Sequence, residues 1–559
     1  MKIHKTLLKI ISLIIICCIL SSCGIPRSLI PTTNFGVSTK SAVALAENKE
    51  VYNQNDDDKI SNIYVTVVPK ADQKFVLADL NKDNDYRDDF TPEVKVILQD
   101  GDENGPQFGS FGFGINDANG KMKVRGKSTR LANPKSYKIT LNDKLGLWNG
   151  QKVVNLNKHT LDITKMRNKL AFDYFKTMSN FASMRTKFVV LHIKDLSEQA
   201  TIDKGFVNYG LYTYIEEPDK QYLKNHGLDP NGNLYKANFF EFIKNNGYLN
   251  DVLVDVKSPN YNKDKFEQIL EIKAGKDHKK LIAMLDDVND LRLDIDAVAS
   301  KYFNVDNYLT WLAINIIMGN VDTSTQNFYL YSPSNSSTWY FLPWDYDGSM
   351  GFYNQTNREA AELFSWQKGL SNYWSSFFHK RFFSKAKNVE ALTKKIEELK
   401  LVINHDNTLN MLNSYYNLIS KYINENPQMI KSEIERISNE PEANVKKYYE
   451  SIKYPMPVFT AGPFGNFDKR YFSCEKSFNI DGGEIYYDFV LAKDPDLKDV
   501  VEKMDASELT EFYFEKLPPG VYYYKLTIKN KAGYSQQTFD KYVDEKGTQY
   551  FGVRQVKVD

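Results

Sequence analysis

One apolar segment near the middle of the chain restricts the folds that are possible. Residues 305–318 (VDNYLTWLAINIIM) are apolar at helical spacing and on nearly every face, which predicts a helix buried on all sides. Gly319-Asn320 ends this helix. Two short apolar runs follow at 328–331 and 339–342, separated by a Ser-Pro-Ser-Asn turn, and they predict a hairpin. The polar residues between helix and hairpin are therefore expected on a rigidly supported loop, where binding and catalytic groups are often found.

That loop and the segment after the hairpin carry three polar residues in a distinctive order. Asp322 is followed five residues later by Asn327, and Asp345 comes 23 residues after Asp322. Protein kinases place a catalytic base and two magnesium ligands in this order, because phosphoryl transfer needs oxygen ligands for Mg²⁺ and one carboxylate aimed at the attacking hydroxyl. The structural alternative is that Asp322 caps a turn and Asn327 satisfies backbone groups. The spacing of the first two residues is common by chance, and the second Asp beyond the hairpin favours the functional interpretation.

Four blocks of the sequence resemble one known family. They are 124–130 (VRGKSTR) with 135–139 (KSYKI), 162–170 (DITKMRNKL), 209–217 (YGLYTYIEE) and 319–351, in the family's order. Over about residues 60–355 the chain resembles the spore-coat protein H (CotH) kinase family, whose members are atypical protein kinases. The resemblance implies a bilobal, kinase-like fold, ATP with Mg²⁺ or Mn²⁺ as cofactors, and transfer to Ser or Thr hydroxyls of a protein.

The same resemblance implies roles for the polar loop residues. Asp322 would be the catalytic acid of the loop, and Asn327 and Asp345 would be the metal ligands. The chain departs from ordinary kinases because it has no Asp-Phe-Gly motif. Its sequence Asp345-Tyr346-Asp347-Gly348 offers two candidate acids, of which the family pattern favours Asp345.

Three further residues are candidates for binding the nucleotide. Ser128 lies in a turn of small residues and cations whose backbone N–H groups could approach phosphates, and a solvated hairpin tip is the alternative. Lys138 lies on an expected strand and could pair with phosphates, or point outward as most strand lysines do. The resemblance favours function for both. Glu216 ends a Tyr-rich strand that could be the hinge beside the adenine, or it could be an exposed carboxylate at a strand end.

Two other features are less specific. The glycine-rich stretch at 109–114 does not follow the Gly-x-Gly-x-x-Gly pattern and is interpreted as a loop or a bulged hairpin. Arg167, in the helix expected after Asp162, could pair with a carboxylate or a phosphate, and a surface position is equally compatible with the sequence.

The first 22 residues have the pattern of a signal peptide. Lys2, Lys5 and Lys9 precede an apolar run of 11 residues, 10–20, which is too short to span a bilayer. The run ends in Leu-Ser-Ser-Cys, which resembles the bacterial lipobox with Cys23 as the lipidation site; the alternative is an ordinary secretory signal that contains a Cys. Residues 23–58 are polar and aperiodic and are expected to form a flexible tether. We therefore expect an extracytoplasmic protein anchored to the cell membrane by lipid, with association with spores as a further expectation.

Composition argues against several classes of function. The net charge is +1, from 72 basic and 71 acidic residues, so no overall field favours nucleic acid. Of the four cysteines, only Cys474 would remain as a free thiol in a mature lipoprotein, so no intrachain disulfide is expected. The seven histidines are scattered without the spacing of a zinc site. The sequence has no Gly-x-Ser-x-Gly motif and no legible hydrolase triad.

The 559 residues are enough for several domains. Residues 61–215 have mostly strand patterns with one helix at 165–176, and 380–450 have the pattern of charged amphipathic helices. The Pro- and Gly-containing stretch at 455–463 marks a boundary. Beyond it, runs such as 484–490 and 520–528 alternate with period two, which is typical of a fibronectin-like β-sandwich.

These observations predict an α+β chain with a signal peptide at 1–22, a tether at 23–58, a bilobal kinase-like domain with a C-terminal helical extension at 59–453, and an all-β sandwich at 466–559. The expected function is that of an atypical kinase that transfers the γ-phosphoryl group of ATP to Ser or Thr of an extracytoplasmic or spore-coat protein. Its partners would be that protein and the membrane, and not nucleic acid. The alternative is a non-catalytic surface adhesion or coat-assembly protein with a kinase-like fold. The scarcity of ATP outside the membrane favours the alternative, and the intact acids favour the kinase.

Overall fold

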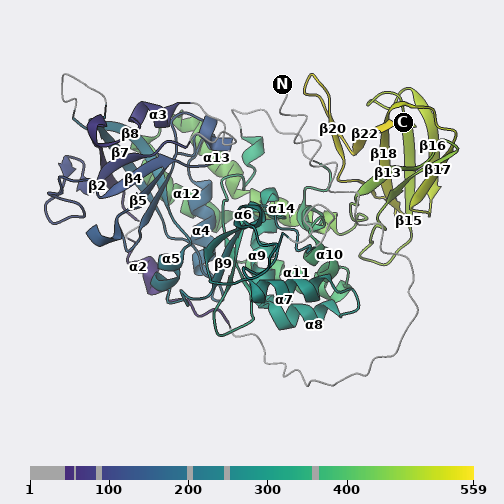
Figure 1. Ribbon diagram of the computed structural model, residues 1–559, viewed down its shortest axis with the longest axis horizontal. Coiled ribbons are helices and arrows are strands. Elements are labelled where there is room, and N and C mark those ends of the chain that lie inside the picture. The colour runs from purple at the N-terminus through teal and green to yellow at the C-terminus, as the bar shows by residue number, and fades with distance from the viewer. Residues whose placement is uncertain are drawn as a thin grey trace.

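The computed structural model of the protein describes residues 44–55, 58–82, 91–126, 128–197, 205–244, 252–355 and 364–559. The predicted signal peptide and Cys23 lie outside these ranges. Across the ranges that are described, no helix has both the length and the apolar character needed to cross a membrane. Figure 1 shows a strand-rich N-terminal part, a central part with most of the helices, and a C-terminal part made of strands.

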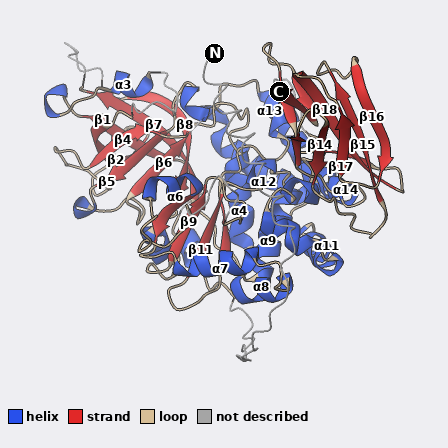
Figure 2. Cartoon of the chain, turned by 45° about the vertical axis from the view of Figure 1, so that its right-hand side comes forward, coloured by secondary structure: helices blue, strands red, loops and turns tan. Residues whose placement is uncertain are grey.

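The N-terminal part is a sheet that closes on itself (Figure 2). Its strand order is β1-β7-β8-β6-β5-β4-β2-β3, and β1 also pairs with β2. Neighbouring strands are antiparallel except β1 and β7, which are parallel. Side chains alternate between buried and more exposed along strands such as β4, and the buried ones form a core of their own. The strands are β1 (Ser61–Val67), β2 (Val94–Asp102), β3 (Gly105–Pro106), β4 (Gly120–Val124), β5 (Tyr137–Leu141), β6 (Val153–Asn157), β7 (Thr186–Asp195) and β8 (Val207–Glu216).

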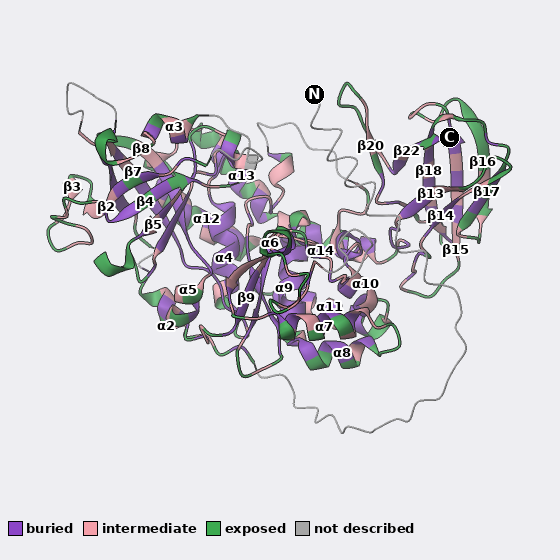
Figure 3. Cartoon of the chain, in the orientation of Figure 1, coloured by how far each residue is buried: buried purple, intermediate pink, exposed green. Residues whose placement is uncertain are grey.

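The central part combines a smaller sheet with most of the helices. The sheet has the order β10-β9-β11-β12, with β9 (Asn233–Ala237), β10 (Leu270–Ala274), β11 (Phe328–Ser332) and β12 (Tyr340–Pro343). Figure 3 shows that α7 and α8 are exposed on their outer faces, as expected for amphipathic helices. The α-helices of the described chain are α2 (Glu50–Asn53), α3 (Leu77–Asn81), α4 (Arg167–Thr177), α5 (Lys220–Asn225), α6 (Lys263–Ile269), α7 (Lys279–Asn289), α8 (Ile295–Tyr302), α9 (Val305–Ile317), α10 (Phe377–Phe383), α11 (Ala386–Leu399), α12 (His405–Ile419), α13 (Pro427–Ser438) and α14 (Glu440–Ser451).

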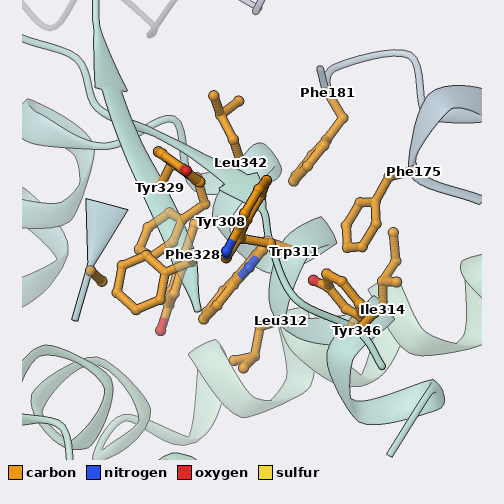
Figure 4. Packing of buried hydrophobic residues seen from close by; sticks show 14 of the residues in the cluster. Phe175, Phe181, Tyr308, Trp311, Leu312, Ile314, Phe328, Tyr329, Leu342 and Tyr346 are labelled. Carbon is orange, nitrogen blue, oxygen red and sulfur yellow. The ribbon is translucent and has the colours of Figure 1, made fainter. Parts of the chain in front are cut away.

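Helix α9 is the centre of the largest hydrophobic core. All of its side chains from Asn307 to Ile317 are buried, which confirms the prediction of a helix covered on every face. Figure 4 shows aromatic rings of α9 and β11 packed together, and Trp311 stacks on Phe341 with ring centroids 4.7 Å apart. The loop that follows α9 is therefore attached to one of the most densely packed elements of the molecule.

The C-terminal part contains two facing sheets and a separate two-stranded sheet, β20-β21. One of the facing sheets has the order β13-β14-β17, and the other β16-β15-β18-β19 with β22 also paired to β18. Buried residues of both sheets form one separate core, as in a β-sandwich. The strands are β13 (Thr460–Gly465), β14 (Lys469–Cys474), β15 (Ile485–Ala492), β16 (Val500–Ser507), β17 (Glu511–Glu515), β18 (Gly520–Asn530), β19 (Ser535–Gln537), β20 (Lys541–Val543), β21 (Gln549–Phe551) and β22 (Val553–Val558).

Two features differ from the sequence-based expectations. Residues 44–55 are not a free tether, because Lys49 Nζ donates hydrogen bonds to three backbone carbonyls at the end of α4 and just after it, and Leu45 is buried in the main core. The N-terminal region also contains the short helix α3 besides the expected α4, and the β1–β2 pairing closes its sheet, which the sequence patterns did not indicate. The contacts of residues 44–55 and the closure of the sheet both depend on partners distant in sequence, which local patterns do not specify.

Candidate functional site

The loop after α9 is fixed by backbone geometry on both sides. Gly319 has a left-handed φ of 58° that ends the helix, and Asn327 has a φ of 59° directly before β11. Between them the chain makes the short 3-10 turn Val321–Thr323. The N–H of Asn327 donates to the carbonyl of Ala237 at the end of β9 (3.2 Å). The loop is therefore anchored both to α9 and to the smaller sheet.

Within this loop Asp322 and Asn327 contact each other directly. Asn327 Nδ2 donates to Asp322 Oδ2 (2.9 Å) and to the Asp322 backbone carbonyl (3.1 Å). The amide of Gln326 donates to the other carboxylate oxygen of Asp322. Asp322 is nevertheless exposed. The carboxylate is thus oriented by two amides and still accessible to a group that approaches from solvent.

The hairpin β11–β12 brings the second acidic segment beside this loop. Asp345 follows it with a φ of 60°, a conformation that carries a steric cost for a residue other than Gly, Asn or Asp. Tyr346 is fully buried, and its N–H donates to Asn168 Oδ1 of α4 (3.2 Å). The N–H of Met350 donates to the carbonyl of Met318 at the end of α9 (2.8 Å). Buried neighbours therefore determine where Asp345 and Asp347 lie.

Four aspartates converge at this position. Burial, together with the negative charges of Asp345, Asp162 and Asp322, raises the pKa of Asp347 well above its usual range. The carboxyl groups of Asp345 and Asp347 lie within hydrogen-bonding reach of each other. Asp347 keeps 40% of its side-chain surface exposed, and its Oδ2 lies 3.9 Å from Nδ1 of the buried His159. Such a group of like charges is favourable only if cations or protons neutralise part of it.

A second charged group lies between the closed sheet and the smaller sheet. Lys138 of β5 donates to Glu217 Oε1 (3.1 Å), and Lys273 of β10 donates to the same oxygen (2.9 Å). Asn155 Nδ2 donates to Glu217 Oε2 (2.8 Å). Although burial opposes ionisation, the two lysines and the amide lower the pKa of Glu217 below its usual range. Glu217 is therefore a buried carboxylate that fixes Lys138 against the opposite sheet.

Arg125 lies between this group and the aspartates. Burial lowers the pKa of its guanidinium, and the charges of Glu217, Asp345 and Asp347 act in the opposite direction. Its Nη1 is buried and has no hydrogen-bond partner within the part of the chain that the structure describes. A buried guanidinium N–H without an acceptor is costly, and an anionic ligand would provide the missing acceptor.

Lys236 of β9 and Trp344 complete the wall beside Asp345. Lys236 Nζ lies 5.6 Å from the centre of the Trp344 ring. Burial lowers the pKa of Lys236, whereas Glu271 and Asp345 raise it. Cations and aspartates thus occupy one continuous region to which β4, β5, β9, β10 and the ends of β8 and β12 contribute.

Not every predicted residue lies in this region. Glu216 is fully buried on the other side of its strand, where it accepts hydrogen bonds from Gln151 Nε2 (2.6 Å), Arg185 Nη2 (2.7 Å) and the Arg185 N–H (3.1 Å) and pairs with His226 Nε2 (2.9 Å). The neighbouring Glu217 faces Lys138 instead. Ser128 begins the short 3-10 turn Ser128–Leu131, and its side chain is outside the described part of the structure.

Arg167 has a structural environment. It is fully buried and forms ion pairs with Asp162 and with Glu433 of α13, and its Nε donates to the carbonyl of Met350 (3.4 Å). Burial alone would raise the pKa of Asp162, but Arg167 and His159 lower it. These contacts of Arg167 thus connect α4 and α13 to the segment that follows Asp347.

Lys236, Lys273 and Arg125 are absent from the sequence prediction of the site. Lys236 and Lys273 lie on short five-residue strands and have no motif around them. Arg125 lies in the block 124–130. Its position just before a glycine turn was the sequence feature that could have indicated a role in the site. Recognising any of them requires knowing that β4, β9 and β10 meet, and that pairing is not local in sequence.

A hollow lies on the other side of the loop that carries Asp322. Its volume is about 600 Å³ including the open mouth, and Asn320 and Val321 form one wall. Gly348, Tyr373 and Lys447 line other sides. Asn320 is buried, and among the described residues its Oδ1 has no hydrogen-bond partner. The backbone on the N-terminal side of Asp322 therefore borders this hollow.

The carboxylates and amide of the loop suit a hard divalent cation. In the described residues, no three Asp, Glu, His or Cys side chains form a complete metal cage. Two carboxylates and an amide oxygen are typical of Mg²⁺ sites in which phosphate oxygens and water supply the remaining ligands. The repulsion around Asp347 and the unpaired Arg125 N–H both fit a site that takes a cation together with an anionic group.

Comparisons with known proteins identify relatives of this chain. The sequence model of the family described as CotH kinase protein matches residues 122–455. The inner spore coat protein H of Bacillus subtilis (strain 168) is 25% identical over 244 residues, which is 43% of this chain and 61% of that protein. The matched region thus spans less than two thirds of the relative's own length. The range matched by the family model, 122–455, includes every residue of the charged region described above.

Proposed function

The chain belongs to the CotH kinase protein family, and from this premise we propose that it is an atypical protein kinase. In the proposed reaction a Ser or Thr hydroxyl oxygen of a protein forms a bond to the γ-phosphorus of ATP. The bond from that phosphorus to the β,γ-bridging oxygen breaks, ADP leaves, and the hydroxyl proton is transferred to a carboxylate.

Asp322 is the proposed acceptor of that proton. It is exposed, so an incoming hydroxyl can approach it, and hydrogen bonds from Asn327 and Gln326 fix its orientation. A base of this kind acts mainly by positioning the nucleophile, and its removal typically lowers the rate by about 10²–10⁴.

Asn327 and Asp345 are the proposed ligands of Mg²⁺, with Asp347 as a third oxygen donor beside them. When bound, the ion neutralises phosphate charge and orients the transferred group. The observation that carries the proposal is the convergence of Asp345, Asp347 and Asp322 with the cation of Arg125, whose buried Nη1 lacks a partner among the described residues. The same cation and Lys138 would pair with the phosphates.

The nucleotide would lie between the closed N-terminal sheet and the smaller sheet. Lys138 and Arg125 come from the first, and Lys236 and Lys273 from the second. This placement supports a bilobal arrangement in which the two sheets belong to different lobes. Glu217 rather than Glu216 faces this space, so the contact that the sequence suggests for Glu216 is proposed to belong to its neighbour.

The setting of the reaction is proposed from the relative's name and from the sequence. Because a relative is described as an inner spore coat protein, we propose that this chain too is associated with spores and acts on a coat or other extracytoplasmic protein. A lipid on Cys23 would attach it to the membrane. A compartment of the sporulating cell that contains ATP would remove the difficulty that ATP is scarce outside the membrane.

The test is transfer of labelled phosphate from ATP to a Ser- and Thr-rich protein with Mg²⁺ or Mn²⁺. We expect Asp345→Ala to abolish metal-dependent nucleotide binding and Asp322→Asn to preserve that binding but remove transfer. Asp481→Ala, in an exposed turn of the sandwich, is the matched control and should behave as the wild type. Equal labelling by the wild type and Asp322→Asn would exclude the kinase and favour a non-catalytic adhesion or assembly protein.

A further inference from the structure

The segment 364–374, called the strap below, joins the sandwich to the loop that carries Asp322. It contains the short 3-10 helix Gly369–Tyr373. Its two ends contact different parts of the molecule, and its middle packs on α14. The contacts at each end determine what the sandwich can do to the catalytic loop.

The first end of the strap is bound to the sandwich. Ser365 Oγ donates to Gln536 Oε1 (2.6 Å), and Trp366 Nε1 donates to the carbonyl of Thr538 (3.1 Å). The Trp366 ring also packs on Phe539 with centroids 4.8 Å apart. Hydrogen bonds and aromatic packing together define one position for this end.

The middle of the strap is held closely against α14, so the strap itself has little freedom of movement. The N–H of Leu370 donates to Ser451 Oγ of α14 (3.2 Å). Gly369 has a φ of 50°, and a Cβ there would lie 2.3 Å from the same oxygen and 2.8 Å from Tyr448 Cα. Ser371 Oγ donates back to the carbonyl of Trp366 (2.8 Å). The strap is therefore a compact, internally bonded segment rather than a loose connection.

The second end of the strap bonds the backbone just before Asp322 and a side chain just after it. The hydroxyl of Tyr373 donates to the carbonyl of Asn320 (3.2 Å) and pairs with Thr323 Oγ1 (3.0 Å). Asn372 Nδ2 donates to the carbonyl of Val321 (3.2 Å). Both side chains are buried. The residues immediately before and after Asp322 are thus held by the strap, while the Asp322 side chain itself remains exposed.

We propose that the C-terminal sandwich positions the catalytic loop through the strap, with Asn372 and Tyr373 as positioning residues for Asp322. The sandwich is then a working part of the enzyme rather than a spacer. This inference rests on the proposed kinase function for its effect on rate. Its effect on the loop itself does not depend on that function.

The structural part of the inference is tested by hydrogen exchange in the full-length protein. Trp366→Ala removes the bond to Thr538 and the packing on Phe539, and it should accelerate exchange of the backbone amides in 320–327, because local opening becomes easier. Tyr513→Ala, on an exposed face of the sandwich, is the control and should leave these amides unchanged. Unchanged exchange in Trp366→Ala would overturn the proposal. If that variant is unfolded, Trp366→Phe takes its place, since it loses the bond to Thr538 and keeps a ring.

The kinetic part compares two buried tyrosines whose hydroxyls each pair with a threonine. Tyr373→Phe should lower kcat on the order of tenfold with the KM for ATP unchanged, because a small displacement of a catalytic group is costly. Tyr174→Phe loses a matched bond to Thr408 Oγ1 (2.7 Å) far from the loop and should leave kcat unchanged. Equal kcat values for the two variants would refute the positioning role.

A double variant decides whether the sandwich acts through the strap. If it does, the effects of Trp366→Ala and Tyr373→Phe on kcat are not additive, because both release the same loop. Additive effects would contradict transmission through the strap. If the wild type transfers no phosphate, the proposed function fails, and the exchange measurement alone still decides whether the sandwich holds the loop.

Discussion

Asp347 lies among other carboxylates, which is unfavourable for its ionised form. Three other aspartates act on it, and the nearby His159 is held neutral because burial lowers its pKa to about 4. At neutral pH the site therefore has a concentration of negative charge without an adjacent protonated imidazole. Binding of a cation should relieve this repulsion more than any change in packing would.

A substitution at Asp347 should show how much the repulsion between the carboxylates lowers the stability of the metal-free protein. Asp347→Asn removes one charge and keeps the shape, so we expect the metal-free protein to gain a few degrees in Tm. Mg²⁺ with nucleotide should then raise the Tm of the wild type more than that of the variant. Differential scanning calorimetry with and without Mg²⁺ measures both effects. A lower metal-free Tm for Asp347→Asn would show that the charges are compensated by the protein itself.

The sequence predicts the polar residues of the loop better than their partners. Asp322, Asn327 and Asp345 are spaced so that helix and hairpin patterns alone place them together. The choice between Glu216 and Glu217 could not be predicted, because adjacent strand residues face opposite sides and one residue of register exchanges them. Lys236 and Lys273 were beyond prediction for a related reason, since their strands meet the site only through long-range pairing.

Among the elements, the ion-pair network around Arg167 links three segments that are far apart in sequence. Arg167 contacts Asp162, Glu433 and the carbonyl of Met350, and Arg436 also binds Glu433. The two side chains that form ion pairs with Arg167, Asp162 and Glu433, are both buried. Helices α4 and α13 are thus joined at the segment after Asp347.

Removal of Arg167 should be strongly destabilising. Arg167→Ala removes the ion-pair partner of the buried Asp162 and leaves the buried Glu433 with Arg436 alone, and breaking a buried pair typically costs about 3–5 kcal/mol. Arg292→Ala is the control, since its pair with Asp290 is exposed and exposed pairs contribute little to stability. Urea unfolding followed by circular dichroism gives both values. A loss of under about 1 kcal/mol for Arg167→Ala would mean that the network relaxes around the gap.

Elements with strong local periodicity could be predicted, and their assembly could not. The helix α9, the hairpin β11–β12 and the strands β15 and β18 have patterns that one segment determines by itself. Closure of the N-terminal sheet depends on β1 pairing with β2, and the strap depends on contacts between residues more than 150 positions apart. Such contacts leave no periodic trace in the sequence.

At the scale of the whole molecule, the sandwich meets the central part through charged as well as aromatic groups. Glu241, partly buried beside the central core, lies near Glu475 of the sandwich, and Glu475 pairs with Lys380 of α10 (2.9 Å). Burial and the charge of Glu475 raise the pKa of Glu241 to about 7. The folded protein therefore binds a proton at Glu241 more tightly than the unfolded chain does.

This shift predicts how pH affects the interface. A pKa raised on folding contributes stability that is present in full below the unfolded value and is lost as pH rises through about 7. Glu241→Gln resembles the protonated form, so its Tm relative to the wild type should increase between pH 5.5 and pH 8. Glu515→Gln, on an exposed strand of the sandwich, should show no such trend. If the Tm difference between Glu241→Gln and the wild type does not change with pH, Glu241 is not the group that titrates in this range.

The left-handed backbone at Asn327 and Asp345 has a consequence for how this chain would drift under mutation. Asn and Asp tolerate this φ and glycine adopts it freely, so the backbone itself does not require a carboxylate at position 345. The loss of Asp345 would remove one charge from a repulsive group, whereas Asn327 holds Asp322 through two hydrogen bonds. A lineage that used this fold only as a scaffold would therefore be expected to discard Asp345. Its presence here is what selection for chemistry would leave in a sequence.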